Sequence, residues 1–280
     1  MTWLDSAILG IVEGITEFLP VSSTGHLILA STLLGLPSTE FLKSFEIAIQ
    51  LGAILAVVLL YWRSLLDFGI LKKIAAAFIP TAVIGLALHS FAKEYLLGNV
   101  QVVLWALAIG GVALIVFELM YKKIVISNVT NPSESQNENG DMVTYDVTNT
   151  VKSDVAAITY KQAVIVGLFQ AIAIIPGVSR SAATIVGGLI VGIRRVAIVE
   201  FSFLLAVPVM LAATGLDLLK SAGTFSSADF SNLAIGFAVS FIVAFFSIRF
   251  LLSYVRKHTF IPFGIYRILA ALAFFLFVVL

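Results

Sequence analysis

Long apolar stretches separated by short polar ones make up most of this chain. A helix needs about 20 apolar residues to cross a hydrocarbon core about 30 Å thick. Six stretches meet this requirement, at residues 44–62, 74–91, 100–121, 197–219, 233–254 and 260–280. The pattern therefore predicts an all-α polytopic membrane protein with six transmembrane helices.

Two further apolar regions, 3–35 and 162–193, are interrupted half-way along by proline, glycine and hydroxyl side chains. The interrupting sequences are Pro20-Val-Ser-Ser-Thr-Gly25 and Pro176-Gly-Val-Ser-Arg-Ser181. Non-helical backbone at membrane depth is tolerated only where protein or a water-filled cavity satisfies its hydrogen bonds. We therefore expect two re-entrant helical hairpins whose tips point into the protein.

The two halves of the chain repeat each other in order. A shift of 156 residues places Pro176 on Pro20 and Ser179 on Ser23. Each half then consists of one hairpin followed by three crossings, and because three is odd, the second half is inverted relative to the first. Hairpins that enter from opposite faces can meet near the midplane. Inverted-topology repeats with broken helices around a central site are typical of transporters.

We expect a single membrane domain with a polar linker between its halves. The halves are residues 1–124 and 159–280. Residues 125–158, which include Asn-Pro-Ser-Glu-Ser-Gln-Asn-Glu-Asn-Gly, are polar and contain few apolar side chains. Such a composition predicts a disordered cytoplasmic linker.

Basic residues border the predicted crossings on one side. Cytoplasmic loops of membrane proteins carry an excess of Lys and Arg. The basic residues are Arg63, Lys72, Lys73, Lys122, Lys123, Arg194, Arg195, Arg256 and Lys257. If both hairpins return to the face they left, all of these lie in the cytoplasm and both termini lie outside.

Composition excludes a soluble protein and a nucleic-acid partner. Hydrophobic residues make up 60% and charged residues 12% of the 280 positions, against about 45 to 50% and about 25% in soluble domains. The 17 Lys and Arg against 16 Asp and Glu leave no basic excess for nucleic acid, so membrane lipid is the expected partner. The absence of cysteine excludes disulfides and thiolate metal sites. The first residues lack the basic segment of a cleavable signal, so the first apolar stretch is expected to stay in the mature protein.

Two acids, Glu13 and Glu17, lie four residues apart in an otherwise apolar segment and so share one helix face. An ionised side chain near the bilayer centre costs a few kcal/mol, which makes each acid a functional candidate. Two like charges at this spacing repel and are best relieved by a shared cation or a shared proton. The alternative is that Glu13 lies near the interface and only solubilises the hairpin.

The hydroxyl-rich turn that follows opens onto a helix. The start of a helix offers unpaired N–H groups and the positive end of a dipole, which suit a phosphate. The candidate phosphate-binding residues are Ser22, Ser23, Thr24 and Gly25. His26, in the first turn, suits a general acid or a nucleophile toward phosphorus. The alternative is that the hydroxyls only cap the helix and the histidine only makes a structural hydrogen bond.

Arg180 is the only charged residue between Lys161 and Arg194, in the second hairpin. A guanidinium at that depth needs an anion, and its fork matches carboxylate or phosphate oxygens. The alternative is a structural salt bridge from Arg180 to Glu17. Other candidates for substrate binding at this helix start are Gly177, Ser179, Ser181 and Thr184. Together the two tips suit a diphosphate and a divalent cation.

Other polar residues within the predicted crossings either line the cavity or lie just inside the interface. They are Glu46, Gln50, Glu200 and Ser202. Glu118 and Arg249 lie near span ends, and their charged groups are expected to reach the interface.

The segments Glu13-Gly-Ile-Thr-Glu17-Phe-Leu-Pro-Val-Ser-Ser-Thr-Gly-His26 and Pro176-Gly-Val-Ser-Arg-Ser-Ala-Ala-Thr184 closely resemble the bacterial undecaprenyl-diphosphate phosphatase family, also called bacitracin-resistance proteins. The likeness extends to residues 45–52 and 200–208 and so covers both halves. The resemblance implies an enzyme that removes the terminal phosphate of undecaprenyl diphosphate with a divalent cation, Mg²⁺ or Ca²⁺. It also implies a place in the bacterial cytoplasmic (inner) membrane, an active site accessible from the outer face, and roles in peptidoglycan synthesis and bacitracin resistance.

The resemblance assigns the functional residues. The family's glutamate pair falls on Glu13 and Glu17, its serine and histidine on Ser23 and His26, and its arginine on Arg180. The metal is expected at the two glutamates. Three nucleophiles remain open, namely Ser23, His26 and a water activated by Glu17; we favour Ser23, with His26 assisting proton transfer.

One residue departs from the family pattern, and several alternatives stay open. The second motif usually has glycine where this chain has Ala182, which restricts the approach of backbone to phosphate. Type-2 phosphatidic-acid phosphatases share similar fragments but need a second histidine soon after Ser-Arg, and neither His89 nor His258 is so placed. The rival functions are a polyprenyl-phosphate flippase and a scaffold of packed hairpins. A homodimer is a possible assembly of the chain.

Overall fold

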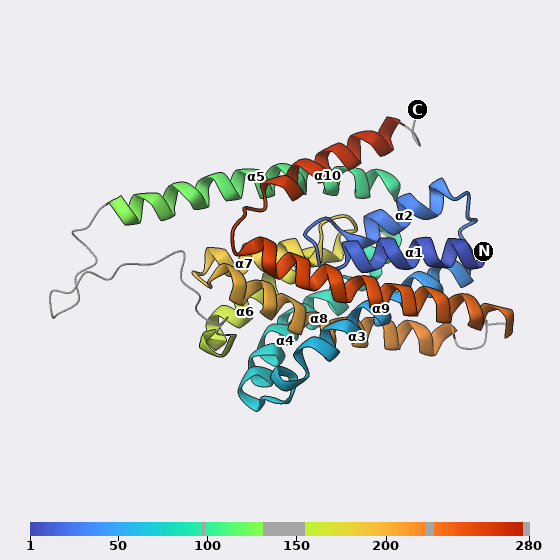
Figure 1. Ribbon diagram of the computed structural model, residues 1–280, viewed down its shortest axis with the longest axis horizontal. Helices are drawn as coiled ribbons and strands as arrows, with labels where there is room; N and C mark the ends of the chain where they lie inside the picture. The colour runs from blue at the N-terminus through green and yellow to red at the C-terminus, as the bar shows by residue number, and fades with distance from the viewer. Residues whose placement is uncertain (97–98, 131–154, 222–226, 277–280) are drawn as a thin grey trace.

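A computed structural model describes residues 1–96, 99–130, 155–221 and 227–276 of the chain (Figure 1). Within these ranges the chain forms helices and no strand. This confirms the prediction of an all-α polytopic membrane protein. Most of the predicted linker, residues 131–154, lies outside the described residues.

Among the described residues, five helices are long and apolar enough to cross a membrane. They are α3 (Glu40–Leu66), α4 (Phe68–Phe91), α5 (Val100–Thr130), α8 (Arg195–Ser221) and α9 (Ser227–Val255). They correspond to the first five predicted crossings. The sixth falls on α10 (Ile261–Phe274), which has 14 residues; a sixth crossing at 260–280 stays a prediction.

The two interrupted regions form pairs of short helices. The first pair is α1 (Trp3–Thr16) and α2 (Ser23–Leu33); the second is α6 (Tyr160–Ala171) with the short turn η4 (Ile172–Ile174), and α7 (Arg180–Ile190). At 1.5 Å per residue these helices are about 16 to 21 Å long, too short to cross a bilayer core of about 30 Å. Both breaks fall where the prolines and hydroxyls predict them, whereas re-entry from the membrane face stays a prediction. Two further short elements are η1 (Ala92–Leu96) and η3 (Val155–Ala157).

The first helix of each pair begins with the same cap. The Thr2 side chain accepts the N–H of Asp5 while the Asp5 carboxylate accepts the N–H of Thr2. Thr159 and Gln162 form the same reciprocal pair at the start of α6. Such a capping box satisfies two of the backbone donors that a helix start leaves free. Thr2 and Thr159 are 157 positions apart.

The second helix of each pair begins at a serine in a left-handed conformation. Ser22 has φ 76° and Ser179 has φ 74°, and each side chain accepts the N–H three residues on. These two caps are also 157 positions apart. The expected match of Ser179 with Ser23 is therefore wrong, because the second loop holds one more residue between its proline and its cap.

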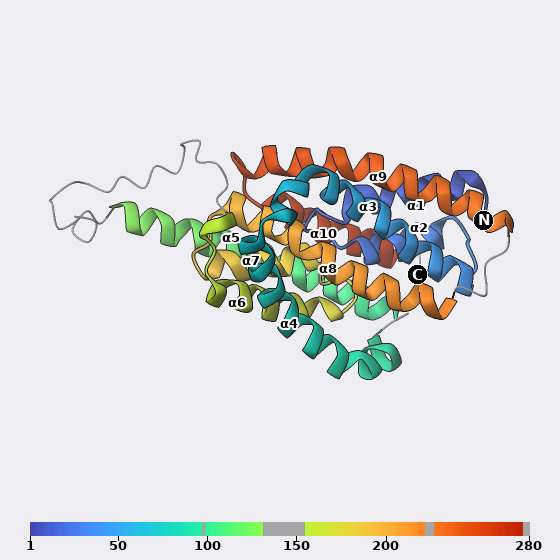
Figure 2. The same cartoon turned by 90° about the horizontal axis from the view of Figure 1, so that it is seen from below.

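The two pairs dock on equivalent long helices at close-packed crossings. A Cβ at Gly10 of α1 would lie 2.7 Å from the Gly236 carbonyl oxygen of α9, and a Cβ at Gly167 of α6 would lie 2.0 Å from the Ala77 carbonyl oxygen of α4. Figure 2 shows α9 along one edge of the bundle and α4 along the opposite edge. α8 lies between them, with Phe201 and other side chains fully buried.

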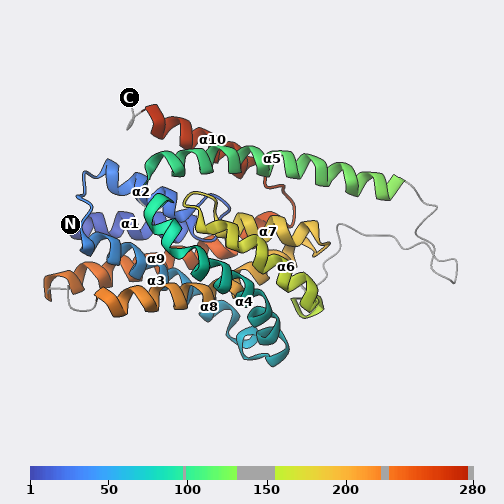
Figure 3. The ribbon, with the colours of Figure 1, turned by 180° about the vertical axis from the view of Figure 1, so that it is seen from behind.

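α5 and α10 lie side by side along another edge of the bundle (Figures 1 and 3). Close to their crossing, the Glu118 carboxylate of α5 binds the guanidinium of Arg195 and accepts the N–H of Phe260 at 2.9 Å. Glu118 is 1% exposed. The expectation that it reaches the interface is wrong, because the carboxylate is paired within the protein; Arg249, by contrast, is exposed.

Candidate active site

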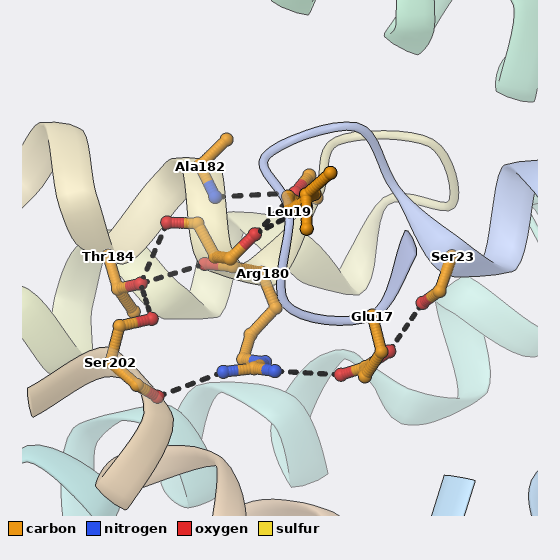
Figure 4. A network of polar contacts seen from close by, with 9 residues as sticks. Glu17, Leu19, Ser23, Arg180, Ala182, Thr184 and Ser202 are labelled. Atoms are coloured by element: carbon orange, nitrogen blue, oxygen red, sulfur yellow. Dashed lines mark hydrogen bonds and ion pairs between the residues drawn. The ribbon is translucent and has the colours of Figure 1, made fainter. Parts of the chain in front are cut away.

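The tips of the two hairpins meet at a buried ion pair (Figure 4). Glu17 ends α1, Arg180 begins α7, and Arg180 Nη2 lies 2.7 Å from Glu17 Oε1. The Ser23 hydroxyl donates to the other oxygen, Glu17 Oε2, at 2.5 Å. Both oxygens of Glu17 are thus occupied, one by a charge from the opposite hairpin and the other by the hydroxyl at the start of α2.

Arg180 has one guanidinium nitrogen that is left for a ligand. Its Nη1 donates to the Ser202 carbonyl oxygen of α8 at 2.9 Å, and its guanidinium lies 5.8 Å from the centre of the Phe18 ring. Its Nε is buried and has no hydrogen-bond partner among the described residues. A buried donor without a partner is costly unless a ligand completes it. This feature goes beyond the structural salt bridge that the sequence left as the alternative.

Glu13 lies one turn before Glu17 and is fully buried, so its carboxylate does not solubilise the hairpin, as the alternative interpretation required. Neither of its carboxylate oxygens has a hydrogen-bond partner within the part of the chain that the structure describes. The carboxylate lies within electrostatic reach of Glu17, Glu46 and Arg180. A buried carboxylate without a donor requires a cation or a proton.

The expected divalent cation fits this donor set in part. Two carboxylates on one helix face supply the hard oxygen ligands that Mg²⁺ or Ca²⁺ prefers. No group of three or more His, Asp or Glu side chains able to hold a metal occurs among the described residues. Mg²⁺ is commonly held by one or two carboxylates together with substrate phosphates and water. The residues therefore suit a cation that is completed by a phosphorylated substrate.

The hydroxyls of the second tip hold the two hairpins together. Ser181 donates to the Leu19 carbonyl oxygen of the first tip at 2.9 Å, and its hydroxyl lies 3.1 Å from that of Ser179 (Figure 4). The Thr184 hydroxyl, fully buried, lies 2.6 Å from that of Ser202. These predicted substrate-binding residues lie beside the ion pair, and their hydroxyls already have partners.

The helix starts keep free backbone donors. The Ser22 and Ser179 caps accept the third N–H of α2 and α7, at Gly25 and Ala182. The N–H groups of the first two residues of each helix have no acceptor in the described ranges; these residues are Ser23, Thr24, Arg180 and Ser181. Two helix starts with free N–H groups can bind anionic oxygens.

His26 of α2 contacts α10 through Tyr266. Its Nδ1 lies 2.8 Å from the Ser22 carbonyl oxygen, and its Nε2 lies 2.8 Å from the Tyr266 hydroxyl. The His26 and Tyr266 rings are stacked, with centroids 5.5 Å apart and planes 11° from parallel. Sequence reasoning placed His26 at the site but did not find Tyr266, since a tyrosine in an apolar helix has no distinguishing pattern.

Sequence reasoning also missed Arg267, the residue that follows Tyr266. Its guanidinium is fully buried and donates to carbonyl oxygens of α5 and of both hairpin loops. The acceptors are those of Pro20, Ala106, Leu107, Gly177 and Val178, at 2.8 to 3.4 Å. Arg267 is a lone charge in an apolar stretch, which is the signal that identified Arg180, and the same rule would have found it.

The other residues that the sequence proposed for the site lie at different depths in the protein and at different distances from the ion pair. Thr24 is exposed, and Gly177 is buried with φ +95°, a conformation that favours glycine. Ser202 reaches the site, and Glu46 lies near Glu13. Glu200 interacts with Tyr61 of α3, and Gln50 is half-buried. For all of these residues a role in catalysis or binding stays a prediction.

Comparison with known proteins decides the family. Residues 6–273 match the family described as "Bacitracin resistance protein BacA". This chain belongs to that family. A protein of Sulfurihydrogenibium sp. named undecaprenyl-diphosphatase is 46% identical over 276 residues, which cover 99% of both chains. One of Aquifex aeolicus with the same name is 46% identical over 281 residues, covering 99% of this chain and all of the relative.

The BacA match and these relatives span both hairpins and the helices between them. A relative from Campylobacter jejuni, also named undecaprenyl-diphosphatase, is 46% identical over 276 residues and covers 97% of this chain and 93% of its own length. The residues that meet at the Glu17–Arg180 pair therefore lie within the region that matches the family.

Proposed function

We infer that this chain is a membrane-embedded undecaprenyl-diphosphatase, which hydrolyses undecaprenyl diphosphate to undecaprenyl phosphate and inorganic phosphate. The inference rests on one arrangement, the buried Glu17 carboxylate that holds Arg180 with one oxygen and Ser23 with the other. It occurs in a chain 46% identical to proteins named for this activity. The product is the lipid carrier for peptidoglycan synthesis, and its recycling accounts for resistance to bacitracin.

The diphosphate is bound by groups that have no hydrogen-bond partner in the described part of the chain. Arg180 Nε and the first N–H groups of α2 and α7 suit phosphate oxygens. Two groups at the Glu17–Arg180 pair have no hydrogen-bond partner among the described residues, the Glu13 carboxylate, which accepts, and Arg180 Nε, which donates. This combination is complementary to a diphosphate carrying a cation, whereas a structural ion pair alone needs neither group.

Ser23 attacks the terminal phosphorus in the first step. Its hydroxyl proton passes to Glu17 Oε2, the atom it already contacts at 2.5 Å. The bond between the terminal phosphorus and the bridging oxygen breaks, and undecaprenyl phosphate leaves with that oxygen. In the second step water attacks the phosphoserine, His26 takes a proton from the water, and Glu17 returns its proton to Ser23 as phosphate leaves.

A divalent cation, Mg²⁺ or Ca²⁺, is the proposed cofactor, with Glu13 and Glu17 as its protein ligands. When bound, such an ion neutralises charge on the phosphate oxygens and so favours attack at phosphorus. Glu13 offers two oxygens with no competing donor, whereas Glu17 is already shared with Arg180 and Ser23.

Phosphate release by the purified protein tests the function. Wild-type protein is expected to release phosphate from undecaprenyl diphosphate when a divalent cation is present, and Glu17→Gln to lose at least about a hundredfold in kcat, because general base and ion pair are both removed. Glu40→Gln is the matched control, since Glu40 is exposed at the start of α3. Transfer of undecaprenyl phosphate across vesicles without phosphate release would instead identify a transporter.

Trapping of the phosphorylated protein tests the nucleophile. Rapid acid quenching is expected to retain phosphate on the wild-type protein and to retain none on Ser23→Ala, because a phosphoserine ester survives acid. An acid-labile adduct would contradict the role of Ser23 and assign the attack to His26.

The chain is proposed to lie in the bacterial cytoplasmic membrane with both termini outside and the site open to the outer face. The support is the set of basic residues on one side of the predicted crossings, Arg194 and Arg195 among them, since cytoplasmic loops carry an excess of Lys and Arg. Because the chain has no cysteine, single cysteines can report the orientation. An impermeant maleimide should label Ser38→Cys in intact cells and Lys257→Cys only after permeabilisation; the reverse would invert the topology.

A further inference from the structure

The α10 helix brings two neighbouring side chains to the hairpin tips, and only one of them has a structural explanation. Arg267 joins both loops to α5 through backbone carbonyls. Tyr266 is 47% exposed, yet its hydroxyl lies 2.8 Å from Nε2 of His26, which is 8% exposed. The planes of the two rings are 11° from parallel, with centroids 5.5 Å apart.

The contacts of His26 define which of its nitrogens carries hydrogen. Nδ1 lies 2.8 Å from the Ser22 carbonyl oxygen, which can only accept. Nδ1 is therefore the donor, and in the neutral ring Nε2 is the acceptor. The Tyr266 hydroxyl donates to this lone pair. After the ring gains a proton, the same hydroxyl oxygen can accept from Nε2–H, because a phenol can be donor or acceptor.

The position of Tyr266 is set by its neighbour. Arg267 donates to Pro20 O in the first loop and to Gly177 O and Val178 O in the second. Its guanidinium fits against α5 because residue 110 is glycine; a Cβ there would lie 2.1 Å from Arg267 Nη2. This anchoring holds Tyr266 at a fixed distance from the loop that carries the Ser22 cap.

We propose that Tyr266 is a positioning residue for the phosphatase reaction. The Ser22 carbonyl holds the hydrogen on Nδ1 of His26, and the Tyr266 hydroxyl holds the other side of the ring. The hydroxyl donates to Nε2 of the neutral ring and accepts from Nε2–H after His26 has gained a proton, so the ring keeps one orientation in both charge states. The proposal rests on the proposed function, in which His26 serves the second step. Tyr266 acts through His26 and touches neither substrate nor metal.

A double-mutant cycle tests this dependence. Tyr266→Phe keeps the ring and removes the hydroxyl; kcat is expected to fall about tenfold, ~1.4 kcal/mol, with KM within about twofold. In a His26→Ala background the same change should alter kcat by less than about twofold. The control is Tyr160→Phe, an exposed tyrosine on α6 that should keep full activity. Equal losses in both backgrounds, or no loss in either, would overturn the proposal.

A spectroscopic measurement tests the hydrogen bond without turnover. The chain has three histidines, so the ¹⁵N ring signals of His26 can be assigned by their loss in His26→Ala. Wild-type protein should give the shifts of a ring with hydrogen on Nδ1 and a hydrogen bond at Nε2. Tyr266→Phe should keep hydrogen on Nδ1 but move the Nε2 signal to that of an acceptor without a hydrogen bond. Identical shifts in the two proteins would overturn the proposal. If His26→Ala has too little activity for the double-mutant cycle, the spectrum alone tests the proposal. A wild-type protein that releases no phosphate would refute the proposed function instead.

Discussion

The hairpin of α1 and α2 and the hairpin of α6, η4 and α7 reach the centre of the protein with the same backbone devices. Each starts at a threonine capping box, and each continues after its break into a helix of 11 residues. Each break ends at a serine cap, Ser22 with φ 76° and Ser179 with φ 74°. Corresponding positions are 157 residues apart throughout.

The same positions carry different chemistry. The corresponding pairs are Glu13 and Gln170, Glu17 and Ile174, and Ser23 and Arg180. The first hairpin thus carries two acids and a hydroxyl, and the second carries the guanidinium. If both hairpins carried the acids, or both carried the guanidinium, like charges would meet at the tips. One hairpin of each kind gives an ion pair and leaves some polar groups for a ligand. The shared backbone provides the site's frame, and the divergence of a few side chains provides its chemistry.

Neutralising the second hairpin should have the largest effect. Arg180→Gln removes the charge that faces Glu17 and the diphosphate, and kcat/KM for phosphate release is expected to fall about a thousandfold, ~4.1 kcal/mol. Arg249→Gln, at an exposed arginine of α9, is the control and should keep wild-type activity. A variant that inserts normally and retains more than about a tenth of the rate would remove Arg180 from phosphate binding.

Making the first hairpin resemble the second should have the next largest effect. Glu13→Gln installs the residue found at position 170 and removes a proposed metal ligand. Turnover is expected to fall about a hundredfold, ~2.7 kcal/mol, and the cation concentration for half-maximal rate to rise at least about tenfold. Phosphate release measured over a Mg²⁺ or Ca²⁺ titration checks both values.

The reverse change provides the matched control. Gln170 is 2% exposed, and its Nε2 donates to the Thr81 hydroxyl at 3.2 Å, a bond that Gln170→Glu would lose. This variant should be less stable to heat but should keep the wild-type cation dependence. If Glu13→Gln kept an unchanged titration, Glu13 would not be a metal ligand.

Sequence predicted the parts of the molecule that local patterns determine. The five long helices follow from apolar length, and both breaks follow from proline and hydroxyl clusters. The charge of Arg180 in an apolar region predicted an anion partner, and Glu17 is that partner. In each case a few consecutive residues carry the physical reason, namely the cost of burying charge or unpaired backbone in lipid.

Sequence failed where the reason lies in distant segments. The five carbonyl acceptors of Arg267 come from three segments far apart in the chain, and no periodicity links them. The partner of His26 lies 240 residues away. The repeat was placed one residue out of register at Ser179, because the second proline lies three residues before its serine cap and the first lies only two before its own. Glu118 was taken for an interfacial residue because its partner Arg195 is likewise distant.

The two hairpins should also differ in how tightly they pack, and this difference should have the smallest effect, a difference in stability between two alanine variants. A Cβ at Gly167 would lie 2.0 Å from the backbone oxygen of Ala77, whereas a Cβ at Gly10 would lie 2.7 Å from that of Gly236. Backbone oxygens cannot move aside as a side chain can, so both alanine variants should be destabilised. The loss should be larger for Gly167→Ala, about 2 kcal/mol, within the usual range for overpacking.

Thermal unfolding in detergent measures this difference, with Gly85→Ala as control. Gly85 lies in α4 with open space around its Cβ position, so alanine should leave the melting temperature unchanged or raise it, since alanine favours a helix over glycine. Equal melting temperatures for Gly10→Ala and Gly167→Ala would mean that the two crossings adapt equally. The divergence between the hairpins would then be confined to the charges at their tips and would not extend to the frame that holds them.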